Sequence, residues 1–197
     1  MAGPVFFPNS WTGKELDFSW PQPSKWTTTK KISEKSSRLT PREVESPHIG
    51  GPKLSFAVGL FLCQNVNHPE QEAFIKVYKQ VPHSGAEFES HAARKAQAGE
   101  LSHSDIEAYK LFMQNQARYL PICLGYKMEH QDDFDVVPGG YVQQVVYSKL
   151  PGLRLDEERF WSFDETQREA ICNAFLSAYK LSLDINHHIG YNPDSWF

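Results

Sequence analysis

The feature that most constrains this chain is the run Ala73-Phe74-Ile75-Lys76-Val77-Tyr78, an apolar, strand-like segment with one lysine inside it. β-Branched and aromatic residues favour strands, so the run predicts a largely buried strand. An ammonium group is costly to bury unless an anion or a hydrogen-bonding group meets it. Lys76 must therefore either find such a partner or extend its amino group into solvent, as strand lysines commonly do.

A second apolar segment comes before this run, and together the two predict a hairpin. Residues 53–63 read as a buried strand and residues 72–80 as the strand that returns. The polar stretch 64–71 between them is typical of a turn. Two strands joined in this way pair antiparallel, so we expect an antiparallel sheet.

Helical patterns follow the hairpin, which makes the expected fold class α+β. Ser104 and Glu107 have the spacing of a capping box at the start of a helix, and Asp164 and Gln167 repeat that spacing. The expected elements are a short helix within 84–99, a helix over 104–119, strands over 122–130 and 141–149, a short helix near 156–162 and a long helix over 164–189.

Residues 1–52 differ from the remainder in composition, and we predict a basic arm rich in Pro, Ser and Thr. Up to residue 53 the chain carries eight Lys/Arg and five Asp/Glu, whereas the remainder has a net charge of −7. Five aromatic residues interrupt this polar segment: Phe6, Phe7, Trp11, Trp20 and Trp26. Aromatic residues can dock such an arm onto a domain, so a docked arm and a free arm both stay open.

The overall charge, the cysteines and the N-terminus indicate the class of protein. A formal charge of −4 favours no nucleic-acid or anionic-membrane partner. Three widely spaced cysteines among apolar neighbours favour buried thiols in a reducing compartment. The first nine residues lack the pattern of a secretory signal, and the longest apolar run is too short to span a bilayer. We therefore expect a cytoplasmic protein.

The order of these elements resembles the small lobe of a protein-kinase-like fold, as found in fungal members of that superfamily. Residues 73–76 look like the V-A-I-K motif of the third kinase strand, and residues 147–152 are similar to the hinge between the lobes. Further similar segments are Ala178-Tyr179-Lys180-Leu181 and His187-His188-Ile189-Gly190, which resemble the helix leading into the catalytic loop.

The resemblance implies a nucleotide site and a division of the chain. Lys76 would hold the phosphates of ATP, Glu107 would orient Lys76, and backbone groups of Ser148 and Leu150 would meet the adenine. Asp194 falls near the position of the catalytic aspartate. Residues 53–152 would form the small lobe and residues 153–197 part of the large lobe.

The sequence also departs from the kinase pattern. Phe74 shares a strand face with Lys76, at a position where the family has a small residue against which adenine packs. We therefore expect Phe74 to plug the nucleotide pocket. The sequence has no D-F-G and no H-R-D motif to supply the metal ligands and the base, so we predict no metal site.

These observations leave three hypotheses for the function. The first is a non-catalytic, pseudokinase-type protein that acts by binding, through the exposed face of the helix over 164–189 or through the arm. The second is a truncated fragment of an ATP-dependent phosphotransferase. The third is an unrelated small α+β interaction domain, in which Glu107 only caps its helix and Lys76 is an ordinary strand lysine.

Overall fold

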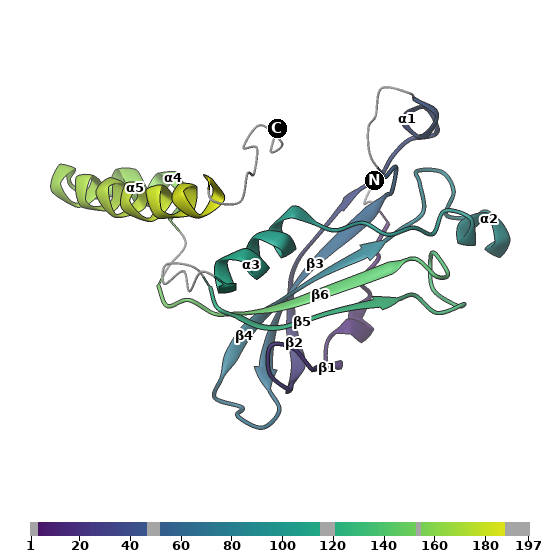
Figure 1. Cartoon of the computed structure of the whole chain (residues 1–197), viewed down its shortest axis with the longest axis horizontal. Helices are drawn as coiled ribbons and strands as arrows, with labels where there is room; N and C mark the ends of the chain where they lie inside the picture. The colour runs from purple at the N-terminus through teal and green to yellow at the C-terminus, as the bar shows by residue number, and fades with distance from the viewer. Residues whose placement is uncertain (1–3, 47–51, 115–120, 153–154, 188–197) are drawn as a thin grey trace. The chain divides into compact units, whose positions relative to one another are not determined.

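The computed structural model describes residues 4–46, 52–114, 121–152 and 155–187. Within these ranges it confirms the α+β class (Figure 1). The strands are β1 (Glu15–Phe18), β2 (Ser24–Ser37), β3 (Phe56–Asn65), β4 (Glu72–Gln80), β5 (Cys123–His130) and β6 (Tyr141–Ser148). The helices are the 3₁₀ turn η1 (Asn9–Trp11), α1 (Pro41–Glu45), α2 (His91–Lys95), α3 (Ser104–Gln114), α4 (Glu157–Ser162) and α5 (Glu165–His187).

The strands form one antiparallel sheet that is nearly closed into a barrel. Its order is β1-β2-β3-β4-β6-β5, so β1 and β5 are the two edges. At one end these edges meet, because the Tyr126 N–H donates to the Trp20 carbonyl at 3.0 Å and the Ser24 hydroxyl donates to the Leu124 carbonyl at 3.3 Å. Register shifts in β2 and β5 accompany this curvature, as β-bulges increase the local bend of a strand.

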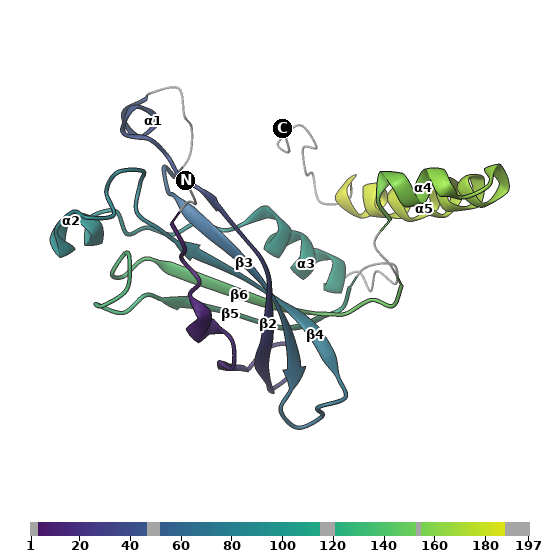
Figure 2. The ribbon, with the colours of Figure 1, turned by 180° about the vertical axis from the view of Figure 1, so that it is seen from behind.

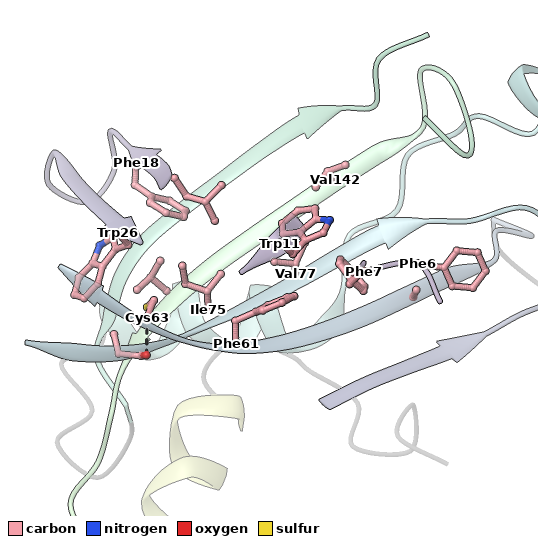
Figure 3. Packing of buried hydrophobic residues seen from close by; sticks show 14 of the residues in the cluster. Phe6, Phe7, Trp11, Phe18, Trp26, Phe61, Cys63, Ile75, Val77 and Val142 are labelled. Carbon is pink, nitrogen blue, oxygen red and sulfur yellow. Dashed lines mark hydrogen bonds between the residues drawn. The ribbon is translucent and has the colours of Figure 1, made fainter. Parts of the chain in front are cut away.

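Alternation along the strands gives the sheet an apolar inner face. On β3 the residues Ala57, Phe61 and Cys63 are fully buried, and on β4 Ile75 and Val77 are fully buried. Residues between them face the opposite side and are only half-buried. Figure 3 shows the inner side chains gathered along the concave side of the sheet.

The N-terminal segment, residues 4–11, fills this inner face (Figure 3). The rings of Phe7, Trp11 and Phe61 pack together, with centroid distances of 5.2 to 5.8 Å. Glu34 on β2 accepts hydrogen bonds from the Phe6 and Phe7 N–H groups, at 2.6 and 3.3 Å. Of the two alternatives for this part of the chain, the docked one is therefore observed.

Lys31, Glu34 and Gly59 accommodate the N-terminal segment on the sheet. The Lys31 ammonium donates to the Phe7 carbonyl at 2.8 Å and pairs with Glu34 at 2.9 Å. A Cβ atom on Gly59 would lie 2.7 Å from a Phe61 ring carbon and 3.0 Å from a Phe7 ring carbon, so only glycine leaves room for both rings. Polar side chains on β2 thus bind the backbone of the segment, and Gly59 on β3 leaves room for its rings.

The predicted arm over 1–52 needs correction in one respect. Residues 15–18 and 24–37 are strands β1 and β2, so much of the arm belongs to the sheet that we assigned to residues 53–152. The reason is that β2 pairs with β3 from Trp26 to Ser37, with two register shifts, which gives its polar backbone hydrogen-bond partners.

The predicted hairpin, the strands near 122–130 and 141–149 and the short helix near 156–162 are observed close to their expected bounds. The predicted helix within 84–99 is limited to α2, because Gly85 has φ +91° and the Ser90 hydroxyl caps a helix that starts at His91. Of the predicted helix over 104–119, residues 115–119 lie outside the described residues.

The chain divides into two compact units. One comprises residues 1–107 and 122–149, and includes the whole sheet; the other comprises residues 108–121 and 150–197. In the second unit, the Gln167 N–H donates to the Asp164 carboxylate at 2.8 Å and the Asp164 N–H donates to the Gln167 side chain at 3.3 Å, which confirms the predicted capping box before α5. In the described part of the chain, no helix combines the length and apolarity needed to cross a membrane.

We predict that Phe7→Ala lowers the free energy of unfolding by about 3–5 kcal/mol, because it removes a fully buried ring from the inner face. Val5→Ala, two residues earlier at a largely exposed position, is the matched control and should change it by less than about 0.5 kcal/mol. Urea unfolding followed by tryptophan fluorescence measures both. Equal effects of the two substitutions would contradict the docked arrangement.

Candidate functional site

The candidate site lies on the outer face of β4, opposite the N-terminal segment. Phe74, Lys76 and Tyr78 alternate with the buried inner residues and therefore share this face. Figures 1 and 2 show the N-terminal segment on one side of the sheet and the start of α3 on the other. Lys76 is half-buried, and its Nζ lies 5.0 Å from the centroid of the Tyr78 ring, within the range of a cation–π interaction.

An aromatic pair occupies the face on one side of Lys76. Phe74 lies directly opposite Tyr147 on β6, and their ring centroids are 5.9 Å apart with the planes tilted by 36°. Cross-strand aromatic pairs of this kind stabilise antiparallel sheets. The position next to Lys76 thus carries two large, half-buried aromatic rings.

A second aromatic cluster lies on the other side of Lys76. The His103 ring stacks on Tyr78 at 4.0 Å and meets the Phe56 ring edge to face at 4.7 Å. His103 Nε2 lies 3.1 Å from the Tyr141 hydroxyl oxygen, and both residues are buried. Burial raises the pKa of the Tyr141 phenol above its usual value, so this group stays protonated at neutral pH.

Glu107 lies in the first turns of α3, in the same compact unit as Lys76. Its carboxylate accepts a hydrogen bond from the Ser102 hydroxyl at 2.5 Å. The predicted capping box with Ser104 needs correction, because Ser104 is already helical and the His103 carbonyl accepts the first N–H groups, those of Ile106 and Glu107. His103, in place of Ser104, is therefore the residue whose carbonyl accepts the first helical N–H groups.

The two predicted hinge residues have different environments. The Ser148 N–H donates to the Ile122 carbonyl at 2.8 Å, and the Ser148 hydroxyl accepts from the Ile122 N–H at 2.9 Å. Ser148 is therefore engaged in joining β6 to the start of β5. Leu150 belongs to the other unit and has an exposed side chain. Asp194, the candidate for the catalytic base, lies outside the described residues, as does Gly190.

The chemistry available around Lys76 is that of an ammonium group among aromatic rings. Among the described residues, no group of three or more His, Cys, Asp or Glu side chains is placed to hold a metal ion. No family model, no curated protein and no solved structure matches the chain. The arrangement can bind an anion or serve as a packed structural face, and the aromatic content favours packing.

Sequence reasoning named Lys76, Phe74 and Glu107 but did not name His103, which packs on Tyr78. The histidine precedes the helix, and no sequence period connects it with Tyr78, 25 positions earlier. One signal was present: Tyr78 follows Lys76 by two positions, so strand alternation places its ring on the same face.

We predict that Lys76 and Glu107 are energetically coupled. A double-mutant cycle with Lys76→Met and Glu107→Gln should give a coupling of about 0.5–2 kcal/mol, because both side chains are half-buried. The glutamine keeps an oxygen that can accept from Ser102, so the cycle isolates the charge. Lys76→Met with Glu100→Gln, at an exposed carboxylate, is the control cycle. Equal coupling in both cycles would contradict a Lys76–Glu107 interaction.

Proposed function

We propose that this chain is a non-catalytic, kinase-like protein that acts by binding other proteins. The order of strand, strand with Lys76, helix with Glu107, two strands and a long helix supports a kinase-like origin. The observation that carries the non-catalytic part is the Phe74–Tyr147 pair beside Lys76. An adenine ring would need the space that these two side chains occupy.

The backbone at the proposed hinge supports the same conclusion. Adenine recognition in a kinase-like hinge relies on backbone groups that are free to pair with the base. Here the Ser148 N–H is already bonded to Ile122. Lys149 follows and pairs with Glu72 at 2.5 Å, which further holds this segment to the sheet. A nucleotide would have to break contacts that stabilise the fold.

The test is a nucleotide-binding experiment on the full chain. A nucleotide that binds the folded state must raise the melting temperature. We therefore expect ATP with Mg²⁺ to raise the melting temperature of the wild-type protein by no more than about 1 °C and to release no phosphate. A clear stabilisation with turnover would overturn the proposal and favour the alternative, an ATP-dependent phosphotransferase in which Lys76 holds the phosphates.

Phe74→Ala gives this test a sharper form. If Phe74 fills a nucleotide pocket, Phe74→Ala should make the melting temperature rise on addition of ATP. The double variant Phe74→Ala with Lys76→Met should show no such rise. Phe160→Ala, which truncates an aromatic residue on α4 in the other unit, is the control and should gain no response. No gain in Phe74→Ala would indicate that the face never held a nucleotide, as in an unrelated α+β interaction domain.

The binding surface that we propose is the apolar face of α5. Ile171, Phe175 and Tyr179 recur every four residues, and the rings of Phe175 and Tyr179 stack at 5.8 Å. Phe175 is 65% exposed and Tyr179 is 49% exposed. Between residues 165 and 180 the helix has no buried side chain. An amphipathic helix with such a spacing suits an apolar groove on a partner protein.

We expect Phe175→Ser with Tyr179→Ser to abolish capture of a protein that wild-type chain captures from a cell extract. Thr166→Ala with Asn173→Ala, at two exposed positions on the other side of the same helix, is the matched control and should retain it. Serine is tolerated on an exposed helix surface at a cost below about 1 kcal/mol per residue, so the fold should persist. Capture that is equal in both variants would rule out this face.

A further inference from the structure

Two register shifts in β2 change the spacing of the side chains that reach the inner face of the sheet. On β3 the inner residues recur at every second position, as strand alternation requires: Gly59, Phe61 and Cys63. Their cross-strand partners on β2 are three positions apart: Glu34, Lys31 and Thr28. Each shift adds one residue to β2 and thereby keeps all three polar side chains on the inner face. We name Thr28, Lys31 and Glu34 the β2 row.

All three side chains of the β2 row bind the backbone of the N-terminal segment. The Thr28 hydroxyl donates to the Trp11 carbonyl. The Lys31 ammonium donates to the Phe7 carbonyl at 2.8 Å. The Glu34 carboxylate accepts from the Phe7 N–H at 3.3 Å and from the N–H of the preceding residue at 2.6 Å. Because every peptide carries these backbone groups, the β2 row fixes the position of a peptide without reading its side chains.

The side chains of the segment divide into buried anchors and exposed positions. Three aromatic residues are buried: Phe6, Phe7 and Trp11. Val5 and residues 8–10 are exposed. Figure 3 shows the three anchor rings on the inner face, where two of them pack against Phe61. A few buried aromatic anchors with exposed residues between them are typical of a peptide bound to a protein surface.

The segment is joined to the sheet by a short exposed connection. Thr12, Gly13 and Lys14 are exposed, and Gly13 has φ +82°. The Thr28 carbonyl accepts from the Gly13 N–H at 2.7 Å, and the Thr28 N–H donates to the Lys14 carbonyl at 3.0 Å, so the connection is fixed to β2 from Gly13 onward. Residues 4–12 belong to no strand of the sheet, so their release breaks no strand pairing.

We propose that the β2 row and the inner face beside it form a peptide-binding site, which residues 4–12 occupy as a built-in competitor. The ligand is a segment of a partner protein with two adjacent aromatic residues and a tryptophan four positions after the second. Because the inner face must stay filled, only a ligand that supplies comparable rings can replace residues 4–12. This site does not include α5, so it stands or fails independently of the α5 face.

A separate protein is a better source of this ligand than a second copy of the chain. Each copy holds its own segment next to its own sheet, at an effective concentration on the order of 1 mM. A second copy therefore has little free segment to donate. The same competition sets a threshold, since a partner must bind the inner face more favourably than residues 4–12 do.

The test is the binding of a fluorescein-labelled peptide with the sequence of residues 4–12 to the full chain, measured by fluorescence anisotropy. The acceptor is Phe7→Leu, which keeps an apolar side chain of similar size and therefore a folded sheet. The peptide should bind this variant at least about 10-fold more tightly than wild type, because the competing segment has lost the ring that packs on Phe61. Val5→Ala, at an exposed position of the segment, is the control and should behave as wild type.

A second acceptor keeps the test independent of one substitution. Trp11→Phe retains a ring at the third anchor but loses part of its contact with Phe61, so it should also bind the peptide more tightly than wild type. Thermal unfolding of both variants without peptide verifies that each acceptor is folded.

Modified peptides assign the binding to the β2 row. Methylation of the Phe6 nitrogen removes the N–H that Glu34 accepts at 2.6 Å and should weaken binding by about 10-fold or more. Methylation of the Val5 nitrogen, one position earlier at an exposed residue, is the matched control and should have little effect. The Phe7→Ala peptide should lose binding, because it lacks a fully buried anchor.

Three outcomes would overturn the proposal. The first is that neither acceptor binds the peptide at concentrations up to about 1 mM. The second is equal binding to wild type and both acceptors, or equal binding of the two methylated peptides, since either result places the peptide away from the β2 row. The third is that unlabelled full-length wild type competes as strongly as unlabelled peptide, which would make a second copy the source of the ligand.

Discussion

The packing of Phe7 and Trp11 against Phe61 is the interaction on which the remainder of the sheet unit depends. A strongly curved sheet has a concave face that must be filled, because interiors tolerate few voids. In this chain the filling comes from a segment that precedes every strand. Glu34 fixes that segment by accepting its N–H groups, so one carboxylate aligns the aromatic rings with the inner face.

This arrangement decides which face of the sheet is left for other contacts. The inner face is occupied, so Lys76 and its neighbours lie on the outer face with the start of α3. There the aromatic residues are distributed on both sides of the lysine, as Phe74 with Tyr147 and Tyr78 with His103. A face packed in this way is suited to stabilising the fold. Among the described residues, the large apolar side chains that are exposed to solvent include Phe175 and Tyr179 on α5 and Phe88 and Phe134 in the sheet unit.

The sequence predicted the elements whose signal is local. β4 was expected over residues 72–80 and is observed over Glu72–Gln80, because its run of apolar, β-branched and aromatic residues lies within the strand itself. β2 was missed for the opposite reason. Apart from Trp26 and Thr28, its residues are half-buried or exposed, and its Thr, Ser and Lys content is typical of a loop. It is a strand because β3 pairs with it from Trp26 to Ser37 and β1 pairs with its first four residues, Ser24 to Thr27.

The sequence by itself determined the α+β class, the central hairpin, the shared face of Phe74 and Lys76 and the cap at Asp164. Each of these follows from residues within a few positions of one another, where strand alternation and helix capping act. Only the tertiary structure decided the pairs that meet across long separations: Phe7 with Phe61, Tyr78 with His103, and His91 with Asp133. The physical reason is that strand register and sheet closure bring these residues together, and neither is encoded in any single segment.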